Sequence, residues 1–229
     1  MSEAIDKYKT TEEKNNKLTR GHILYQIGCT LMQALRVASI LENRLNTSFQ
    51  YVEPTESNYN TYSLESRSII VEACIQIEAI AQRFYHLTTN KTDKFSWKKF
   101  SKYIRSTDTI KIYGSNETTS SSILYLTNSY VLFKPFQSIM LFEYELIHLQ
   151  PWLEAKEEKM PSWWNGYNKI KHNGNVDFSF CTYHKAIEAI AGLYLMIAFI
   201  SFEMQYPLAK NTEFKPKFFY SKELDACFE

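Results

Sequence analysis

The chain has 229 residues, of which 45% are hydrophobic and 15% aromatic, so it can bury one full core and is not globally disordered. Only 6 Gly and 6 Pro argue against a turn-rich all-β protein. The 26 basic and 25 acidic residues leave a formal net charge of +1, which excludes a global field that draws the protein to nucleic acid or membrane. Any such binding must therefore come from a local patch.

The N-terminal segment and the cysteines indicate the compartment. Residues 1–20 are polar and mixed in charge, and they lack the apolar stretch of a secretory signal. The cysteines are Cys29, Cys74, Cys181 and Cys227, and none forms a CxxC pair. Three of them sit among apolar residues, which favours free buried thiols over a metal or disulfide role. We therefore expect a cytoplasmic protein.

The first predicted elements are an arm and two amphipathic helices. Residues 1–20 are expected to form a flexible N-terminal arm. From Ile23 to Leu45, apolar residues recur at steps of three and four, which is typical of an amphipathic helix. A polar connection over 46–62 leads to a second such helix, which Ser63 can cap and whose apolar stripe runs from Ile69 to Phe84.

The middle of the chain is less regular. Residues 88–122 are polar and are broken by Gly114 and a Thr/Ser run, so we expect an insertion between core helices. Within it, Phe95 to Ile104 is predicted as a short helix and Ile110 to Tyr113 as a short strand. Residues 123–149 return to high hydrophobicity and are predicted as one or two helices.

The last core helix has the clearest pattern. Its apolar run, Ala189 to Phe202, is shorter than the ~20 residues that a membrane span needs, and Glu188 and Glu203 bracket it, so a buried core helix is expected. The single domain thus covers 21–206. A basic aromatic tail, 207–229, follows, and it can contact nucleic acid or pack across a surface or a dimer interface. These elements predict an all-α fold, a helical bundle of four or more long helices plus one short helix.

The most informative segment is 162–174, which reads Ser-Trp-Trp-Asn-Gly-Tyr-Asn-Lys-Ile-Lys-His-Asn-Gly. A segment that only packs does not need so many groups that donate, accept or carry a proton. Pro161 and Ser162 are expected to start a short helix here, and Asn173-Gly174 to end it. On this helix, side chains four residues apart form two neighbouring lines. One line holds Trp164, Asn168 and His172, and the other holds Tyr167 and Lys171.

This segment carries the predicted chemistry. His172 lies at the end of the helix, where the macrodipole favours a positive imidazole, so it can act as a general acid or base near neutral pH. Lys169 and Lys171 supply positive charge that suits an anion such as a phosphate. Asn168 can orient the imidazole or the ligand. Against this stands a purely structural interpretation, in which the histidine caps the helix, the tryptophans anchor it and the lysines are solvated.

Ser-Trp-Trp-x-x-Tyr-Asn-x-x-Lys-His before a long hydrophobic helix resembles the C-terminal motif region of the HEPN superfamily. The resemblance extends loosely from Ile23 to Met204 and rests almost wholly on Trp163 to His172. It implies an α-helical, commonly dimeric domain. Many members are metal-independent endoribonucleases of toxin–antitoxin, CRISPR-linked or anti-phage systems, and others have lost catalysis and serve as binding or scaffold modules.

The family motif is Arg, then four to six residues, then His, and a polar residue often follows the Arg. Here Tyr167 stands in the Arg position, Asn168 is the polar follower and His172 is the histidine. HEPN-like groups with Tyr-Asn-x-x-Lys-His after paired tryptophans also occur. The resemblance implies that His172 transfers the proton, that Lys171 or Lys169 meets the phosphate with a point charge in place of the guanidinium fork, and that Tyr167 stacks on a base or donates its hydroxyl.

Three interpretations follow. The first is a HEPN-like, metal-independent endoribonuclease, a homodimer whose catalytic residues are His172, Asn168, Lys171 and Tyr167. The second is a non-catalytic HEPN-like module that binds RNA, a nucleotide or a partner protein. The third is an all-α interaction domain whose Trp-rich helix merely packs. No metal or cofactor is expected, because the histidines show no metal-ligand spacing. The expected partners are a second copy, RNA, and an antitoxin or defence-system protein, but no membrane.

Overall fold

The computed structural model describes residues 2–53, 55–89, 94–106, 109–111, 118–120, 129–133, 147–157, 159–172, 178–204, 206, 208 and 212–228. Among these residues the fold is mostly helical, with small strands added, so the predicted helical class is confirmed at this level. The described residues hold three long helices rather than the predicted four or more.

The long helices are α1 (Ser2–Ser48), α2 (Leu64–Thr89) and α6 (Tyr183–Glu203). The shorter ones are α3 (Trp97–Ser106), α5 (Ser162–His172) and α7 (Lys222–Phe228). Single turns of 3-10 helix occur at η1 (Glu56–Asn58), η2 (Leu153–Glu157), η3 (Phe178–Phe180) and η4 (Thr212–Phe214). Two small antiparallel sheets pair β1 (Thr109–Lys111) with β2 (Thr118–Ser120), and β3 (Val131–Phe133) with β4 (Ile147–Leu149) on one side and β5 (Phe219–Tyr220) on the other.

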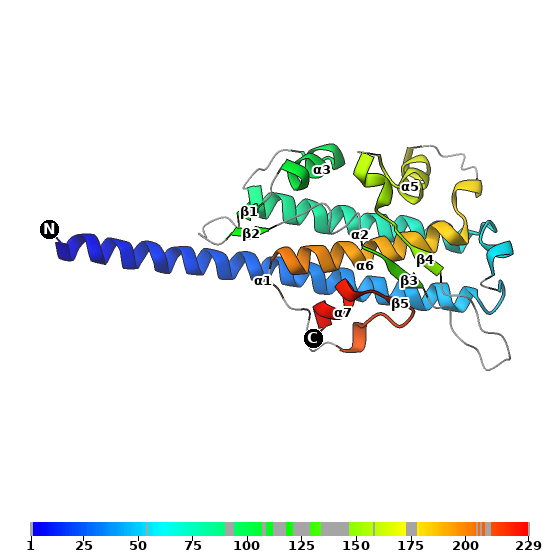
Figure 1. Cartoon of the computed structure of the whole chain (residues 1–229), viewed down its shortest axis with the longest axis horizontal. Coiled ribbons are helices and arrows are strands. Elements are labelled where there is room, and N and C mark those ends of the chain that lie inside the picture. The colour runs from blue at the N-terminus through cyan, green and yellow to red at the C-terminus, as the bar shows by residue number, and fades with distance from the viewer. Residues whose placement is uncertain are drawn as a thin grey trace.

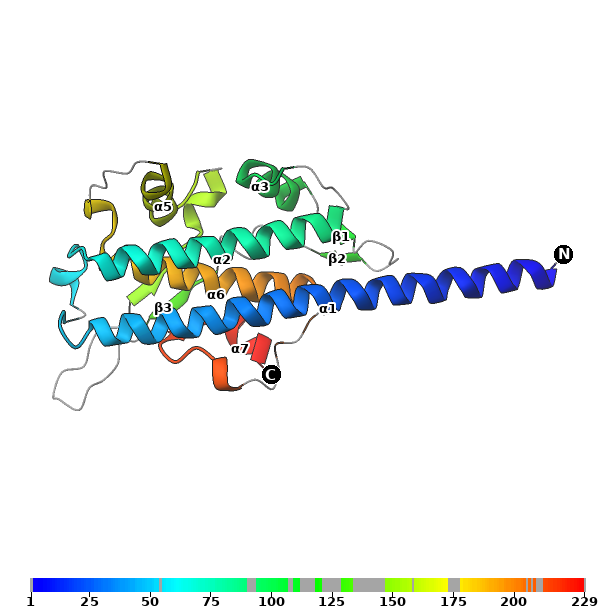
Figure 2. The same ribbon diagram turned by 180° about the vertical axis from the view of Figure 1, so that it is seen from behind.

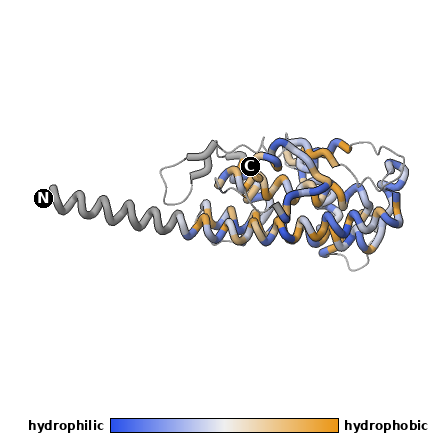
Figure 3. Tube along the Cα trace, turned by 90° about the horizontal axis from the view of Figure 1, so that it is seen from below, coloured by the Kyte–Doolittle hydropathy of each residue, from blue (hydrophilic) through white to orange (hydrophobic). Residues whose placement is uncertain are grey.

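The three long helices lie side by side, and α6 packs against both α1 and α2 (Figures 1 and 2). α1 and α2 are amphipathic, with apolar and polar residues alternating along them (Figure 3), and each buries one stripe. α6 is buried on nearly all sides, which explains why its sequence is apolar almost without a break. The predicted core helix at 189–202 is thus confirmed.

Two helical segments, Gly21–Ser48 and Tyr183–Glu203, are long and apolar enough to cross a membrane by length and composition alone, which is weak support for a span. In α6, 89% of the apolar window is buried inside the domain. Core helices of soluble proteins pass the same test, and burial accounts for this apolar run without a bilayer.

Local capping agrees with the predicted starts of the helices. The Ser63 hydroxyl accepts a hydrogen bond from the backbone N–H of Ser66 at 2.9 Å, so it caps α2 as expected. The Thr182 hydroxyl does the same for the backbone N–H of Lys185 at 3.3 Å and caps α6. The short helix predicted from Phe95 is confirmed as α3.

Two predictions differ from the structure. The backbone of residues 2–20, expected to be a flexible arm, continues α1 and extends beyond the other helices (Figure 1). Residues 123–149 are predicted as one or two helices, but their described parts hold β3 and β4 instead, while 123–128 and 134–146 lie outside the described residues. In β3 the first and third residues are buried and the second is half-buried, so burial repeats every two residues. A three-residue strand inside an apolar run is too short for this repeat to be recognised in the sequence.

The predicted insertion, 88–122, is described only in parts. Its first two residues complete α2, and α3 follows with Phe100 packed edge-on against Phe84 of α2. The strand predicted at 110–113 overlaps β1, whereas 112–117 lie outside the described residues. Phe100 of α3 is therefore packed into the core.

The C-terminal tail packs on its own domain. Glu42 of α1 is 1% exposed, and its carboxylate accepts hydrogen bonds from the backbone N–H groups of Lys217 (2.9 Å) and Phe218 (2.7 Å) and from the Tyr194 hydroxyl (3.0 Å). β5 then pairs with β3, which places Phe219 in the core. Of the two roles predicted for the tail, packing is the one observed.

We predict that Glu42→Ala lowers the free energy of unfolding by about 2–4 kcal/mol, because it leaves two part-buried backbone N–H groups and a buried hydroxyl without their acceptor. Glu42→Gln should cost much less, since the amide oxygen still accepts both N–H groups and a buried charge is removed. Urea unfolding at pH 7 followed by circular dichroism measures both. An alanine variant as stable as wild type would mean that Glu42 does not hold the tail.

Candidate functional site

The Trp-rich segment forms α5, which packs on α2 and α6. The backbone N–H groups of Trp164 and Asn165 donate to the Pro161 carbonyl at 3.0 and 3.1 Å, so the helix starts where the sequence predicts. It ends at His172, just before the predicted Asn-Gly stop. α3 and α5 both lie along the side of α2 that faces away from α1 (Figures 1 and 2).

All four tryptophans of the chain meet in one cluster beside α5. Trp97 stacks on Trp152 with ring centroids 5.2 Å apart, and it also lies 5.2 Å from Trp164. Trp163 meets Trp152 edge-on at 5.2 Å. The motif tryptophans, Trp163 and Trp164, are 0% and 3% exposed. The interpretation of the paired tryptophans as core anchors is therefore confirmed.

The indole N–H groups of the two most buried tryptophans, Trp152 and Trp163, have hydrogen-bond partners, as buried donors require. Trp163 donates to the Pro151 carbonyl and Trp152 to the Gly192 carbonyl, each at 3.0 Å. Gly192 also makes room for the cluster, because a Cβ built there would lie 2.8 Å from Cζ2 of Trp163. This contact seats α5 directly on α6.

The line of Tyr167 and Lys171 converges on a glutamate of α2. The Tyr167 hydroxyl donates to Oε2 of Glu78 at 2.9 Å, and the Lys171 ammonium lies 3.4 Å from the same oxygen. Tyr167 is 3% exposed, whereas the side chain of Lys171 is 47% exposed and that of Glu78 is 35% exposed. Glu78 is half-buried and joins the site.

The electrostatics of this cluster keep its charges in place. Burial raises the pKa of the Tyr167 hydroxyl, and its hydrogen bond to Glu78 raises it further, so the hydroxyl remains a neutral donor. Hydrogen bonding with Tyr167 and the nearby Glu78 charge raise the pKa of Lys171, so its ammonium remains charged. The cation of Lys171 is thus balanced by the carboxylate of Glu78.

The other predicted line is only partly visible. Trp164 belongs to the tryptophan cluster, and Asn168 is half-buried with no hydrogen bond to another described residue. His172 is the last residue of α5, and its side chain lies outside the described part of the structure. Of the four predicted site residues, the structure therefore brings together Tyr167 and Lys171, and it adds Glu78.

Sequence reasoning missed a second group beside α5. The Lys169 ammonium lies 3.4 Å from the ring centroid of Phe180 in η3, and the Lys185 ammonium of α6 lies 5.2 Å from the same centroid. The carbonyl of Phe180 approaches so closely that a Cβ built on Gly166 would lie 2.9 Å from it. Phe180 and Lys185 carry no signal in the sequence, because only the fold brings them to Lys169.

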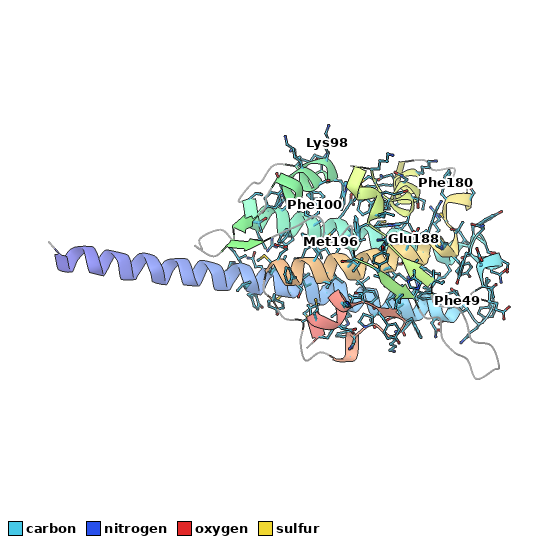
Figure 4. The ribbon with its side chains drawn as sticks, viewed as in Figure 1. Phe49, Lys98, Phe100, Phe180, Glu188 and Met196 are labelled. Atoms are coloured by element: carbon cyan, nitrogen blue, oxygen red, sulfur yellow. The ribbon has the colours of Figure 1, made fainter. Side chains whose placement is uncertain are left out.

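A titratable pair lies further along α6. The imidazole Nε2 of His184 is 3.7 Å from Oε1 of Glu188, which Figure 4 labels. Burial raises the pKa of Glu188 to about 7, with the charge of Glu154 adding to the shift, and burial lowers the pKa of His184. Among the residues that the structure describes, no group of three His, Cys, Asp or Glu side chains could hold a metal ion.

Comparison of the chain with known protein families, with curated proteins and with solved structures gave no match. The arguments for a function therefore rest on the residues and their geometry.

We predict that Trp163→Ala lowers the free energy of unfolding by about 3–5 kcal/mol, because it empties a fully buried site and leaves the Pro151 carbonyl without its donor. Asn165→Ala, at an exposed position on the same helix, is the matched control and should change stability by less than about 1 kcal/mol. Chemical denaturation of both variants checks this. Equal stabilities would show that α5 is not anchored through its tryptophans.

Proposed function

We propose that the chain is a HEPN-like protein that cleaves RNA without a metal ion, in the cytoplasm, as a toxin or an anti-phage defence protein. The single observation that carries the proposal is the meeting of α2 and α5 at Glu78, Tyr167 and Lys171, directly beside the helix end that carries His172. The motif that resembles the HEPN superfamily lies on that helix, ahead of the long apolar α6.

The residues of α5 suit the steps of RNA cleavage. The reaction needs a base for the ribose 2′-OH, a cation for the pentavalent phosphorane and an acid for the leaving 5′-oxygen. His172 at the helix end would transfer the proton. Glu78 holds Lys171 in place, and nearly half of that side chain remains exposed. The hydroxyl of Tyr167 is directed at Glu78, so this residue positions the pair rather than stacking on a base.

One observation favours a second candidate, a non-catalytic module that binds RNA, a nucleotide or a partner protein. Tyr167 occupies the family's Arg position but is buried, and Lys171 is neutralised by Glu78. The site therefore lacks a free cation, among the described residues, at the place where the family has its guanidinium.

The proposed protein is a homodimer, and the outer face of α1 and α2 supports this. Ile40 and Ile75 are 48% and 46% exposed, large values for branched apolar side chains. Ile40 lies one turn before Arg44, which pairs with Glu72 at 2.8 Å, and Ile75 lies one turn after Glu72. Arg83 is exposed at the other end of the same stripe of α2. A second copy that packs antiparallel to the first would place its Arg83 near Glu72 of the first copy.

We predict that the wild-type protein cleaves pooled cellular RNA in EDTA and leaves 2′,3′-cyclic phosphate ends. His172→Ala should lower the cleavage rate by about 10²–10⁴-fold, the usual worth of a general acid or base. Asn165→Ala, an exposed substitution on the same helix, is the control. Gel analysis of the products and their end groups, with circular dichroism to confirm folding, provides the measurement.

Wild-type protein that is folded and binds RNA without cutting it would reject catalysis and favour the binding module. Equal cleavage rates for wild type and His172→Ala would show that His172 is not part of the catalytic site.

We further predict that Ile75→Glu converts the dimer into a monomer, because it places a charge at the centre of the buried apolar contact. Tyr51→Glu, at a position that is 85% exposed outside α1 and α2, should leave the dimer intact. Size-exclusion chromatography with light scattering gives the masses. A wild-type protein that is monomeric at all concentrations, or an unchanged Ile75→Glu dimer, would contradict the assignment of this face.

A further inference from the structure

Two cations of this chain are gathered on one aromatic ring. The ammonium groups of Lys169 and Lys185 lie 3.4 and 5.2 Å from the ring centroid of Phe180. They come from different helices, α5 and α6, and Phe180 lies on the turn that joins these helices (Figure 4). Two positive charges gathered near one ring raise the local positive potential, which favours binding of an anion there.

Neither of these two lysine charges is neutralised by an ion pair among the described residues, although the charge of Lys185 acts on the carboxyl group of Glu188. Neither Lys169 nor Lys185 forms an ion pair with a carboxylate in the described part of the chain, whereas Lys171 is paired with Glu78 at 3.4 Å. Glu188 lies one turn beyond Lys185, but burial raises its pKa to about 7, so it carries only part of a charge near neutral pH. Positive charge that can bind an anion is therefore available at Phe180 rather than at Glu78.

The ring that gathers the lysines is itself held in place. Gly166 allows the Phe180 carbonyl to pack closely against α5, since a Cβ built there would lie 2.9 Å from the carbonyl oxygen. Cations that are positioned in advance lose less conformational freedom when a ligand binds. Half-buried Asn168 precedes Lys169 on this helix, and its amide can bond to phosphate and sugar oxygens.

We propose that Lys169 and Lys185 together bind a backbone phosphate of single-stranded RNA that crosses the outer side of α5, and that Lys171 does not contact the RNA backbone. The inference rests on the proposed function, because it assigns the phosphate contacts of that same site. The phosphate-binding role is thereby assigned to Lys169 of α5 and Lys185 of α6 rather than to Lys171, which is adjacent to His172. The motif lies on α5 and does not include α6.

The test is the salt dependence of binding of a fluorescein-labelled oligouridine, followed by anisotropy in EDTA. The double variant Lys169→Gln/Lys185→Gln removes both charges with little change in length. We expect the double Gln variant to bind about tenfold more weakly than wild type near physiological salt. The slope of log K against log salt should decrease in magnitude by about 0.7 for each phosphate that the variant no longer neutralises. Lys169→Arg/Lys185→Arg should retain the wild-type slope, since both charges remain.

Lys98→Gln, which removes an exposed lysine of α3 away from Phe180 (Figure 4), is the matched control and should bind oligouridine as wild type does. Lys171→Gln tests the division of roles, and we expect it to weaken binding far less than the double variant, whatever its effect on cleavage. Thermal unfolding of each variant establishes that it is folded.

The outcomes separate the two proposals. A double Gln variant with the wild-type affinity and slope would overturn this inference while leaving the proposed function intact. A loss in Lys171→Gln as large as in the double variant would overturn the division of roles. Wild-type protein that neither binds nor cleaves RNA would overturn the proposed function, and this inference with it.

Discussion

The structure depends on the burial of α6 on nearly all of its sides. One apolar helix in this position needs cover from several directions, and different parts of the chain supply it. α1 and α2 cover it along their apolar stripes. The tail covers it where Phe219 packs against Tyr194 at 5.6 Å, and the tryptophan cluster covers it at Gly192. Because each cover is apolar and local, α1, α2, α5 and α7 take their places from their contacts with this helix.

The Trp-rich segment consequently serves two purposes. Its first half is buried, and Trp163 fixes the start of α5 against α6. Its second half turns polar groups toward α2 and the surface, where Tyr167 and Lys171 reach Glu78 and Lys169 reaches Phe180. A change in the tryptophans therefore alters the position of the polar groups as well as the stability. Loss of activity in a Trp163 variant alone could not distinguish packing from chemistry, whereas substitutions at exposed positions can.

Periodicity predicted the parts of this fold in which one helix face is buried over many residues, namely α1 from Ile23, α2 and α6. It was wrong for the described parts of 123–149, residues 129–133 and 147–149, where three-residue strands inside an apolar run leave no periodic signal. In the site, spacing along α5 correctly placed Tyr167 beside Lys171. It could not reveal Glu78, which lies 89 residues before Tyr167, because such a pairing exists only after α2 and α5 pack together.

The segment that resembles the HEPN motif has a tyrosine where that motif has Arg, and this has a physical consequence for the site. Position 167 is 3% exposed, and a guanidinium there would have to be desolvated against Glu78, which is costly even for a paired charge. A neutral phenol makes the hydrogen bond to Glu78 without that cost, and Lys171 supplies the balancing charge from the solvent side. Both cationic capacity and exposure are thereby lost at position 167. A site that still binds a phosphate must draw its charge from elsewhere on the same surface, and Lys169 with Lys185 is the pair that the fold places within reach.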